Sequence, residues 1–183
     1  MPVALRTPRL LLREWRDGDA EAFAVMSADA GLTEFLLPPD EAWVTRARAS
    51  WVTRARAYWD RHGFGQFVVE LPGVASFIGV VGLGDAHPAV PAAPAIEAAW
   101  RLARPYWGQG YALEAARAAI DDGLGRLGFK EIIAITVVGN QRSRRVMERL
   151  GMTRDPAEDF DFDHPWIPPG HKLRRHVLYR TRR

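Results

Sequence analysis

The sequence predicts a mixed α/β protein, and two patterns carry this prediction. Residues 96–102 and 131–138 have the apolar, extended pattern of strands, and a helix is expected between them over 111–127. A strand–helix–strand unit of this size requires a parallel strand pair and a right-handed crossover. Residues 67–83 contain the turn signal Pro72-Gly73 and predict an antiparallel hairpin. Parallel and antiparallel pairs together give a mixed sheet.

Length and composition favour one domain with an apolar core. The 183 residues fit a single domain over 1–183, and 48% of them are apolar. The absence of cysteine excludes disulfides, thiolate zinc sites and a cysteine nucleophile, and is compatible with a reducing cytoplasm. No apolar run predicts a signal peptide or a membrane span, so we expect a cytoplasmic protein without a membrane partner.

The chain begins with a strand and a helix. Residues 9–13 predict the first strand, and residues 20–26 predict a helix. Asp17 or Asp19 is expected to cap this helix, because a carboxylate can accept the unpaired N–H groups of the first turn.

A second, longer helix is expected over residues 40–61, after Pro38-Pro39 and before a stop at Gly63. It contains a tandem duplication, in which residues 43–50 are followed by the near-identical 51–58. Eight residues rotate a helix by about 80° beyond whole turns, so the two copies cannot present the same face. We interpret the duplication as a lengthening of the helix; the alternative is a basic, aromatic surface for nucleic acid or membrane.

The C-terminal half alternates strands and helices. Residues 86–94 are rich in Ala and Pro and predict an exposed loop. The helix at 111–127 has small residues on one face, which permits close packing on a sheet. A further helix should start at Asn140 or Gln141 and end at Gly151, and residues 176–180 predict the last strand.

The stretch that indicates chemistry is a glycine-bearing turn between a strand and a helix. Gly108 and Gly110 let the backbone approach a ligand closely, and the first N–H groups of the helix form an anion site suited to a pyrophosphate. A Rossmann interpretation fails, because Leu113 stands where a third glycine is needed and Gly139-Asn140 follows the next strand in place of an acidic residue.

Residues 107–115, Trp-Gly-Gln-Gly-Tyr-Ala-Leu-Glu-Ala, resemble the acetyl-CoA loop of RimJ/RimL-type members of the GNAT N-acetyltransferase superfamily. The superfamily signature is Gln/Arg-x-x-Gly-x-Gly/Ala. This chain matches at Gly110 and Ala112 and carries Trp107 at the Gln/Arg position, a departure common in RimJ/RimL-like members.

Three other segments agree with this resemblance. Residues 140–152 are similar to the family's Asn-x-x-Ser-x-x-Val-x-Glu-x-Leu-Gly-Phe/Met block, residues 97–100 to its Glu-Ile-Gly-Tyr, and residues 6–13 to its first strand. The resemblance spans nearly the whole chain in the right order.

The resemblance implies the GNAT fold, a mixed sheet of about six to seven strands flanked by helices and splayed between its two parallel strands. Acetyl-CoA would be the cofactor, with its pantetheine arm in the opening and no metal. The cofactor-binding residues implied are Trp100, Arg101, Leu102, Trp107, Gly108, Gln109, Gly110, Tyr111, Ala112, Asn140 and Ser143.

The implied reaction is attack of a neutral amine on the thioester. Amines are protonated near pH 7, so a base must take a proton, and Glu97 is the first candidate. Ser143 would lie near the CoA sulfur as acid or anchor. Glu158, in an acidic run over 155–163 that could attract a cationic amine, is a competing base. The alternatives are a solvent-facing Glu97, Asn140 as a helix cap, and a solvated acidic loop.

Rival functions are a non-catalytic acyl-CoA-binding or sensing domain and a basic nucleic-acid-binding module. The net charge of only +3 and the acidic run count against nucleic acid. Asp161, Asp163, His164, His171 and His176 follow no metal-ligand spacing, so no metal is expected. The acceptor is expected to be a small-molecule amine or a peptide N-terminus, and a homodimer is the family's common habit.

Overall fold

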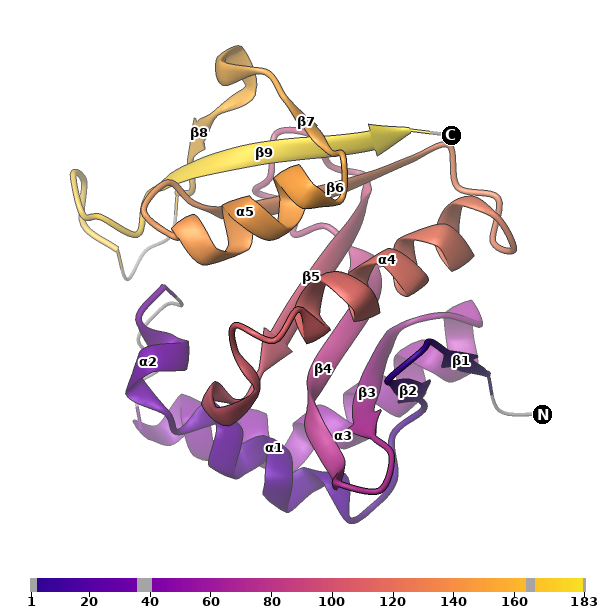
Figure 1. The fold of residues 1–183 in the computed structure, drawn as a ribbon. Coiled ribbons are helices and arrows are strands. Elements are labelled where there is room, and N and C mark those ends of the chain that lie inside the picture. Colours follow the sequence, from indigo (N-terminus) through magenta and orange to yellow (C-terminus); the bar gives the residue numbers. More distant parts are fainter. Residues whose placement is uncertain (1–2, 36–40, 164–166, 183) are drawn as a thin grey trace.

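The computed structural model describes residues 3–35, 41–163 and 167–182. A mixed sheet crosses the molecule in the order β1-β2-β3-β4-β5-β6-β9-β7, and β8 pairs with β9 (Figure 1). Among the described strands only β5 and β6 pair in parallel, and their crossover passes through α4. The strands are β1 Ala4–Arg6, β2 Leu11–Arg13, β3 Gln66–Leu71, β4 Ala75–Asp85, β5 Ile96–Leu102, β6 Glu131–Val137, β7 Thr153–Arg154, β8 Phe160–Asp161 and β9 Arg175–Arg182.

All six strands expected from the sequence are confirmed, and three more bring the sheet to nine. The additional strands, β1, β7 and β8, contain only two or three residues each, which is too short for an alternating pattern to show. Each joins an edge or end of the sheet through a neighbour that was predicted.

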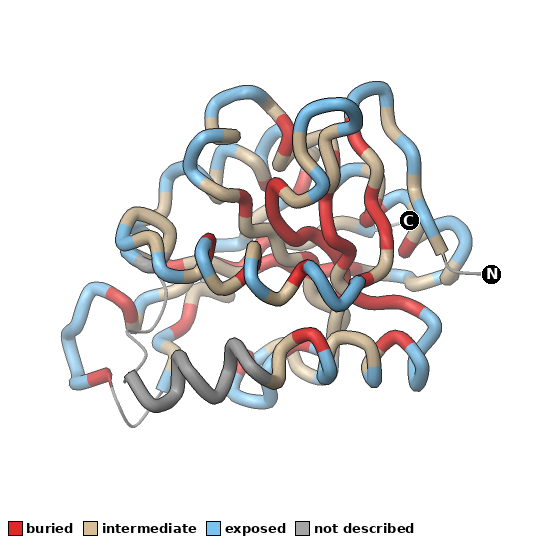
Figure 2. Tube along the Cα trace, turned by 90° about the horizontal axis from the view of Figure 1, so that it is seen from below, coloured by how far each residue is buried: buried red, intermediate tan, exposed pale blue. Residues whose placement is uncertain are grey.

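Helices cover both faces of the sheet, α4 and α5 on one and α1 and α3 on the other (Figures 1 and 2). The α4 face is closely packed: a Cβ on Gly123 would lie 2.5 Å from Leu83 Cδ1 and 2.8 Å from Ile132 Cδ1. The helices are α1 Asp19–Ser27, α2 Ala30–Thr33, α3 Glu41–His62, α4 Tyr111–Leu124 and α5 Gln141–Arg149, with short 3-10 turns at η1 Arg104–Tyr106 and η2 Pro156–Glu158.

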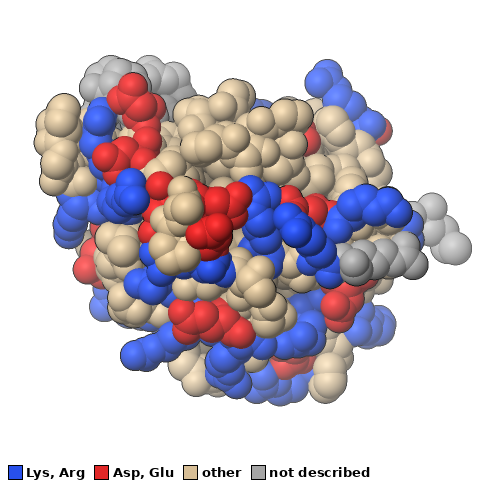
Figure 3. All heavy atoms as spheres, turned by 90° about the horizontal axis from the view of Figure 1, so that it is seen from above, with Lys and Arg blue, Asp and Glu red and all other residues tan. Residues whose placement is uncertain are grey.

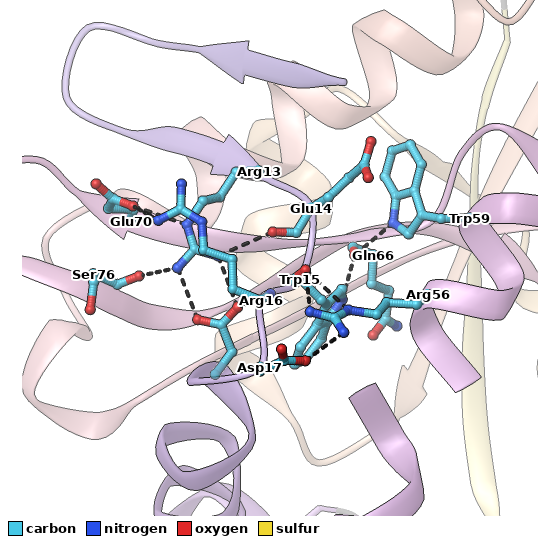
Figure 4. A network of polar contacts seen from close by, with 11 residues as sticks. Arg13, Glu14, Trp15, Arg16, Asp17, Arg56, Trp59, Gln66, Glu70 and Ser76 are labelled. Carbon is cyan, nitrogen blue, oxygen red and sulfur yellow. Dashed lines mark hydrogen bonds and ion pairs between the residues drawn. The ribbon is translucent and has the colours of Figure 1, made fainter. Parts of the chain in front are cut away.

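The predicted cap of α1 is wrong. Gly18 occupies the cap position without a side-chain hydrogen bond, and Asp19 lies inside the helix. Both Asp19 and Arg13 are only 5% exposed, and the guanidinium of Arg13 donates to both Asp19 carboxylate oxygens at 2.8 and 2.9 Å. Arg13 also donates to Glu70 and to the Ser76 carbonyl (Figure 4). The Asp19 carboxylate, which the local sequence pattern assigned to a helix cap, is therefore used in a buried ion pair with Arg13.

The second copy of the duplicated segment and the residue after it pack against the core. Val52 and Trp59 are buried, and Trp51 stacks on Phe23 with ring centroids 5.1 Å apart. Trp59 and Trp15 both donate from Nε1 to the carbonyl of Gln66 and cover the edge of β3 (Figure 4). The side chains of the first copy, like the predicted break at residues 38–39, lie outside the described part of the chain.

The sheet opens between its parallel strands. The only paired position between β5 and β6 is Glu97 with Ile133. Beyond Glu97, residues 98–102 of β5 continue their antiparallel pairing with β4 but have no partner on β6. The expected splay is thus confirmed, and Glu97 stands at the point where it begins.

Candidate active site

The predicted pyrophosphate loop lies at the start of α4, beside the opening. Gly108 and Gly110 have φ of +75° and +82°, a backbone conformation that residues other than glycine rarely adopt. Gly110 is the N-cap of α4 and provides no side-chain hydrogen bond. The first N–H groups of α4 therefore remain available to an anion.

The N-terminal turn holds this loop from one side. The guanidinium of Arg9 donates to the Gln109 carbonyl at 3.0 Å, and pairs with Glu114 of α4 at 2.6 Å. Glu114 also accepts from the Thr7 hydroxyl and the Arg9 backbone N–H, and these contacts lower its pKa against the effect of desolvation. The segment 6–13, recognised only as a first strand, thus also positions the loop.

An open groove of about 610 Å³ runs along α4 from this turn. Four arginines line it together with Glu114 and Asp121, and the guanidinium of Arg9 is paired with Glu114. The arginines that line it are Arg6, Arg9, Arg117 and Arg149.

Trp107 ties the loop back to the splayed strand. Its indole Nε1 donates to the carbonyl oxygen of Leu102 at 2.6 Å. The indole face carries the guanidinium of Arg142, whose Cζ is 4.4 Å from the ring centroid. Arg142 also lies 5.7 Å from the Phe35 ring and 3.5 Å from the Glu34 carboxylate. Arg142 therefore links the start of α5 to both Trp107 and the segment after α2.

Asn140 and Ser143 lie together at the start of α5. Asn140 Oδ1 accepts from the Ser143 N–H at 3.2 Å, which makes Asn140 the helix cap. Asn140 Nδ2 donates to Thr136 Oγ1 at 3.0 Å and to Ser143 Oγ at 3.2 Å. Because Ser143 Oγ accepts the Asn140 amide, its own O–H is left to be donated. The role of Asn140 as the helix cap is compatible with a role of Asn140 and Ser143 in binding a ligand.

Glu97 has the environment of a base. It is half-buried, and no hydrogen bond or ion pair reaches its carboxylate from the part of the chain that the structure describes. Desolvation raises its pKa to about 7. A carboxyl that titrates near neutral pH can accept a proton and release it again, which is the property a general base needs.

Glu158 has the opposite environment. Its two oxygens accept from Arg180 Nε at 2.8 Å and Nη2 at 2.6 Å, and this pairing lowers its pKa. A carboxylate that is held by a guanidinium and hard to protonate is a weak base, so the geometry favours Glu97 over Glu158.

Several carboxylates of the acidic run pair with arginines, some of them from the C-terminal segment. Asp159 pairs with Arg154, and Asp161 and Asp163 pair with Arg175 and Arg174. On the face in Figure 3, acidic and basic side chains are intermixed. These pairs weaken the expectation that the run attracts a cationic substrate, and they account for much of the basic tail as well.

Among the described residues no group of three or more His, Asp or Glu is placed to hold a metal ion. Within the same part of the chain, no helix has the length and apolar character needed to cross a bilayer.

A mixed sheet splayed beside an uncapped, glycine-bearing helix start is the architecture of the acyl-CoA-dependent acetyltransferases. The sequence of residues 9–153 matches the acetyltransferase (GNAT) domain family. The chain belongs to this family.

Three relatives illustrate the similarity. An acetyltransferase from Agrobacterium tumefaciens is 26% identical, with a TM-score of 0.76 and coverage of 99% of this chain and 95% of that one. RimL, a ribosomal L7/L12 α-N-protein acetyltransferase solved in complex with coenzyme A, has the same fold at 15% identity, a TM-score of 0.77 and 98% coverage of both chains. The uncharacterised protein YkkB of Bacillus subtilis is 44% identical over 57 residues, which span 31% of this chain and about a third (33%) of that relative.

The structure adds site residues that the sequence did not indicate. Arg9 and Arg142 contact the loop or its tryptophan, yet each is an ordinary arginine in an arginine-rich chain. Only the proximity of segments about one hundred residues apart reveals the role of Arg9. The start of α5 was predicted correctly, but not that Arg142 would reach back to Trp107.

Proposed function

We propose that this protein transfers the acetyl group of acetyl-CoA directly to a primary amine. The observation that carries the proposal is Glu97, a half-buried carboxyl without a partner among the described residues and with a pKa of about 7, at the point where β5 and β6 separate. Membership of the GNAT family supports it.

The residues present fit acetyl-CoA. The positive φ of Gly108 and Gly110 exposes the N–H groups that start α4, and a Cβ at position 108 would meet nothing within 4 Å. The segment 100–102 offers backbone groups on the open side of β5. Trp107, Gln109, Tyr111, Ala112, Asn140 and Ser143 complete the proposed cofactor-binding set.

In the proposed reaction, acetyl-CoA supplies the acetyl group as a thioester. Glu97 accepts the proton that the amine loses, directly or through a water, as the N–C bond forms and the C–S bond breaks. Ser143 donates a proton toward the departing thiolate through the O–H that Asn140 leaves free. Ser143 regains a proton from solvent and Glu97 returns its proton to solvent, so amine and thioester become amide and thiol with no net change in protons.

Calorimetric titration of acetyl-CoA tests the proposal, with Gly110→Trp as the obstructing variant. Gly128→Trp is the matched control, because Gly128 also has a positive φ (+73°), a Cβ there meets nothing within 4 Å, and the position follows the far end of α4. We expect the wild type and the control to bind and Gly110→Trp to lose binding. CoA release with an amine panel then separates an enzyme from an acyl-CoA-binding domain: binding without release would support the latter, and a folded wild type that does not bind would exclude both.

A further inference from the structure

A second charged side chain lies on the same face of β5 as Glu97. Arg101 follows Glu97 by four positions, and side chains an even number of positions apart share a face of a strand. The pairing with β4 is regular over this stretch, with Glu97 opposite Gly84 and Arg101 opposite Val80, so the alternation is preserved.

Arg101 packs against aromatic rings and has no anionic partner among the described residues. Its Cζ lies 5.1 Å from the Trp51 ring centroid and 6.0 Å from that of Phe23. No carboxylate or carbonyl of the described residues accepts a hydrogen bond from its guanidinium, and desolvation alone lowers its pKa. Arg101 is half-buried, and an anion that pairs with a guanidinium partly withdrawn from water stabilises it; its planar donors suit a carboxylate.

Within the part of the chain that the structure describes, two uncharged polar groups on the elements that pack around Arg101 are buried without a hydrogen-bond partner. They are Trp51 Nε1 and Ser27 Oγ. Ser27 lies one helical turn after Phe23 on α1, and Phe23 stacks on Trp51, so all three groups belong to one neighbourhood. Both atoms are closed to solvent, whereas Arg101 is half-buried, so of the three donors Arg101 is the one placed to meet a ligand.

Between Glu97 and Arg101 the β4 and β5 positions on this face are small, although the backbone of residues 65–66 closes the space over Gly82. Ala99 is the intervening side chain on this face of β5, and Gly82 and Gly84 face it and Glu97 from β4. A Cβ at Gly84 would meet nothing within 4 Å. At about 3.3 Å per residue, the Cα atoms of Glu97 and Arg101 lie about 13 Å apart, a span that two side chains and a small acceptor can bridge.

We propose that the acceptor amine also carries a carboxylate, which Arg101 binds, while Glu97 takes the proton of the amine. The inference rests on the proposed function and specifies its substrate class. Free amino acids and peptides with an acidic side chain near the N-terminus share this chemistry.

Matched acceptor pairs test the proposal. CoA release is measured with glycine, 4-aminobutyrate and 6-aminohexanoate against their amides, and with Ala-Asp-Ala-amide against Ala-Asn-Ala-amide to separate free amino acids from acidic peptides. For at least one pair we expect kcat/KM to favour the carboxylate at least about tenfold. Amidation also changes the pKa of the amine. The decisive quantity is therefore the ratio of kcat/KM for the carboxylate to kcat/KM for its amide, compared between a variant and the wild type.

Arg101→Gln should reduce the preference about tenfold or more, and Arg101→Lys should retain part of it. Arg54→Gln is the matched control: Arg54 also lies over the Trp51 ring, at 5.5 Å, but is exposed, and the preference should persist. Loss of the preference in both variants would indicate a general effect of positive charge and overturn the proposal.

A binding measurement keeps the two proposals distinguishable. Each acceptor is titrated calorimetrically into the CoA-loaded protein, where no transfer can occur. Carboxylates should bind the wild type more tightly than their amides, and Arg101→Gln should remove the difference. If CoA binds and no pair is discriminated, the carboxylate inference is wrong and the proposed function stands; if acetyl-CoA itself does not bind, the proposed function fails first.

Discussion

The indole Nε1 of Trp107 donates a 2.6 Å hydrogen bond to the carbonyl oxygen of Leu102. This bond joins the turn before α4 to the last residue of β5, so one tryptophan sets the distance between the pyrophosphate loop and the splayed strand. The resemblance in sequence singled out position 107 as a departure from the usual Gln or Arg, and the structure gives the residue found there a positioning contact.

Trp107→Phe should weaken acetyl-CoA binding, because it removes this hydrogen bond and keeps the ring. A loss of about 1 kcal/mol corresponds to about fivefold weaker binding in calorimetry. Trp59→Phe is the control, since Trp59 makes an equivalent bond to the Gln66 carbonyl at the edge of β3. Equal weakening in both variants would contradict the assignment.

Glu97→Gln should lower kcat by about 10²- to 10⁴-fold, as expected for loss of a general base. The wild-type rate should rise with pH through about 7, where Glu97 loses its proton, and the variant should lack this limb. Glu158→Gln provides the comparison: if it abolishes turnover while Glu97→Gln does not, the base has been assigned to the wrong carboxylate.

The raised pKa of Glu97 also predicts a dependence of stability on pH. The folded state holds the proton up to about pH 7, whereas the unfolded chain releases it near the ordinary value of 4.5. Ionisation therefore disfavours the folded state, and stability contributed by protonated Glu97 is lost as pH rises from about 4.5 to 7. In urea unfolding, the free energy of unfolding of Glu97→Gln should increase relative to that of the wild type between pH 5 and pH 8. An identical pH dependence of the two proteins would rule out the raised pKa of Glu97.

Asp19→Ala should destabilise the fold by about 3 kcal/mol or more in urea unfolding, because it leaves the buried Arg13 without its closest partner. The matched control is Asp17→Ala. The Asp17 side chain is 94% exposed although it pairs with Arg56 at 2.6 Å, so its loss should cost less than about 1 kcal/mol. Comparable losses from the two variants would contradict a structural role for the buried pair.

Ser143→Ala should lower kcat by about tenfold or more with a small change in acetyl-CoA affinity, if Ser143 supplies the proton to the thiolate. Ser143→Thr, which keeps the hydroxyl, should restore much of the rate. Loss of cofactor affinity without loss of kcat would make Ser143 an anchor for the cofactor only.

Local pattern was sufficient for the long elements. The strands around residues 67–83, the apolar strand at 131–137 and the helix after Gly110 follow from alternation, turn residues and small-residue spacing, which neighbouring positions determine. The two-residue strands β7 and β8 were missed, because they exist only through their pairing with β9.

The sequence by itself determined the family, the position of the loop at Gly108–Gly110 and the candidate residues, because these depend on short segments whose order and spacing are visible in the chain. Only the tertiary structure decided what each charge does. It removed Asp19 from its cap and placed it against Arg13, tied Glu158 to Arg180, and left Glu97 and Arg101 without a partner among the described residues, on one face of β5. Burial and ion pairing depend on residues that are distant in the chain, and folding alone brings them together.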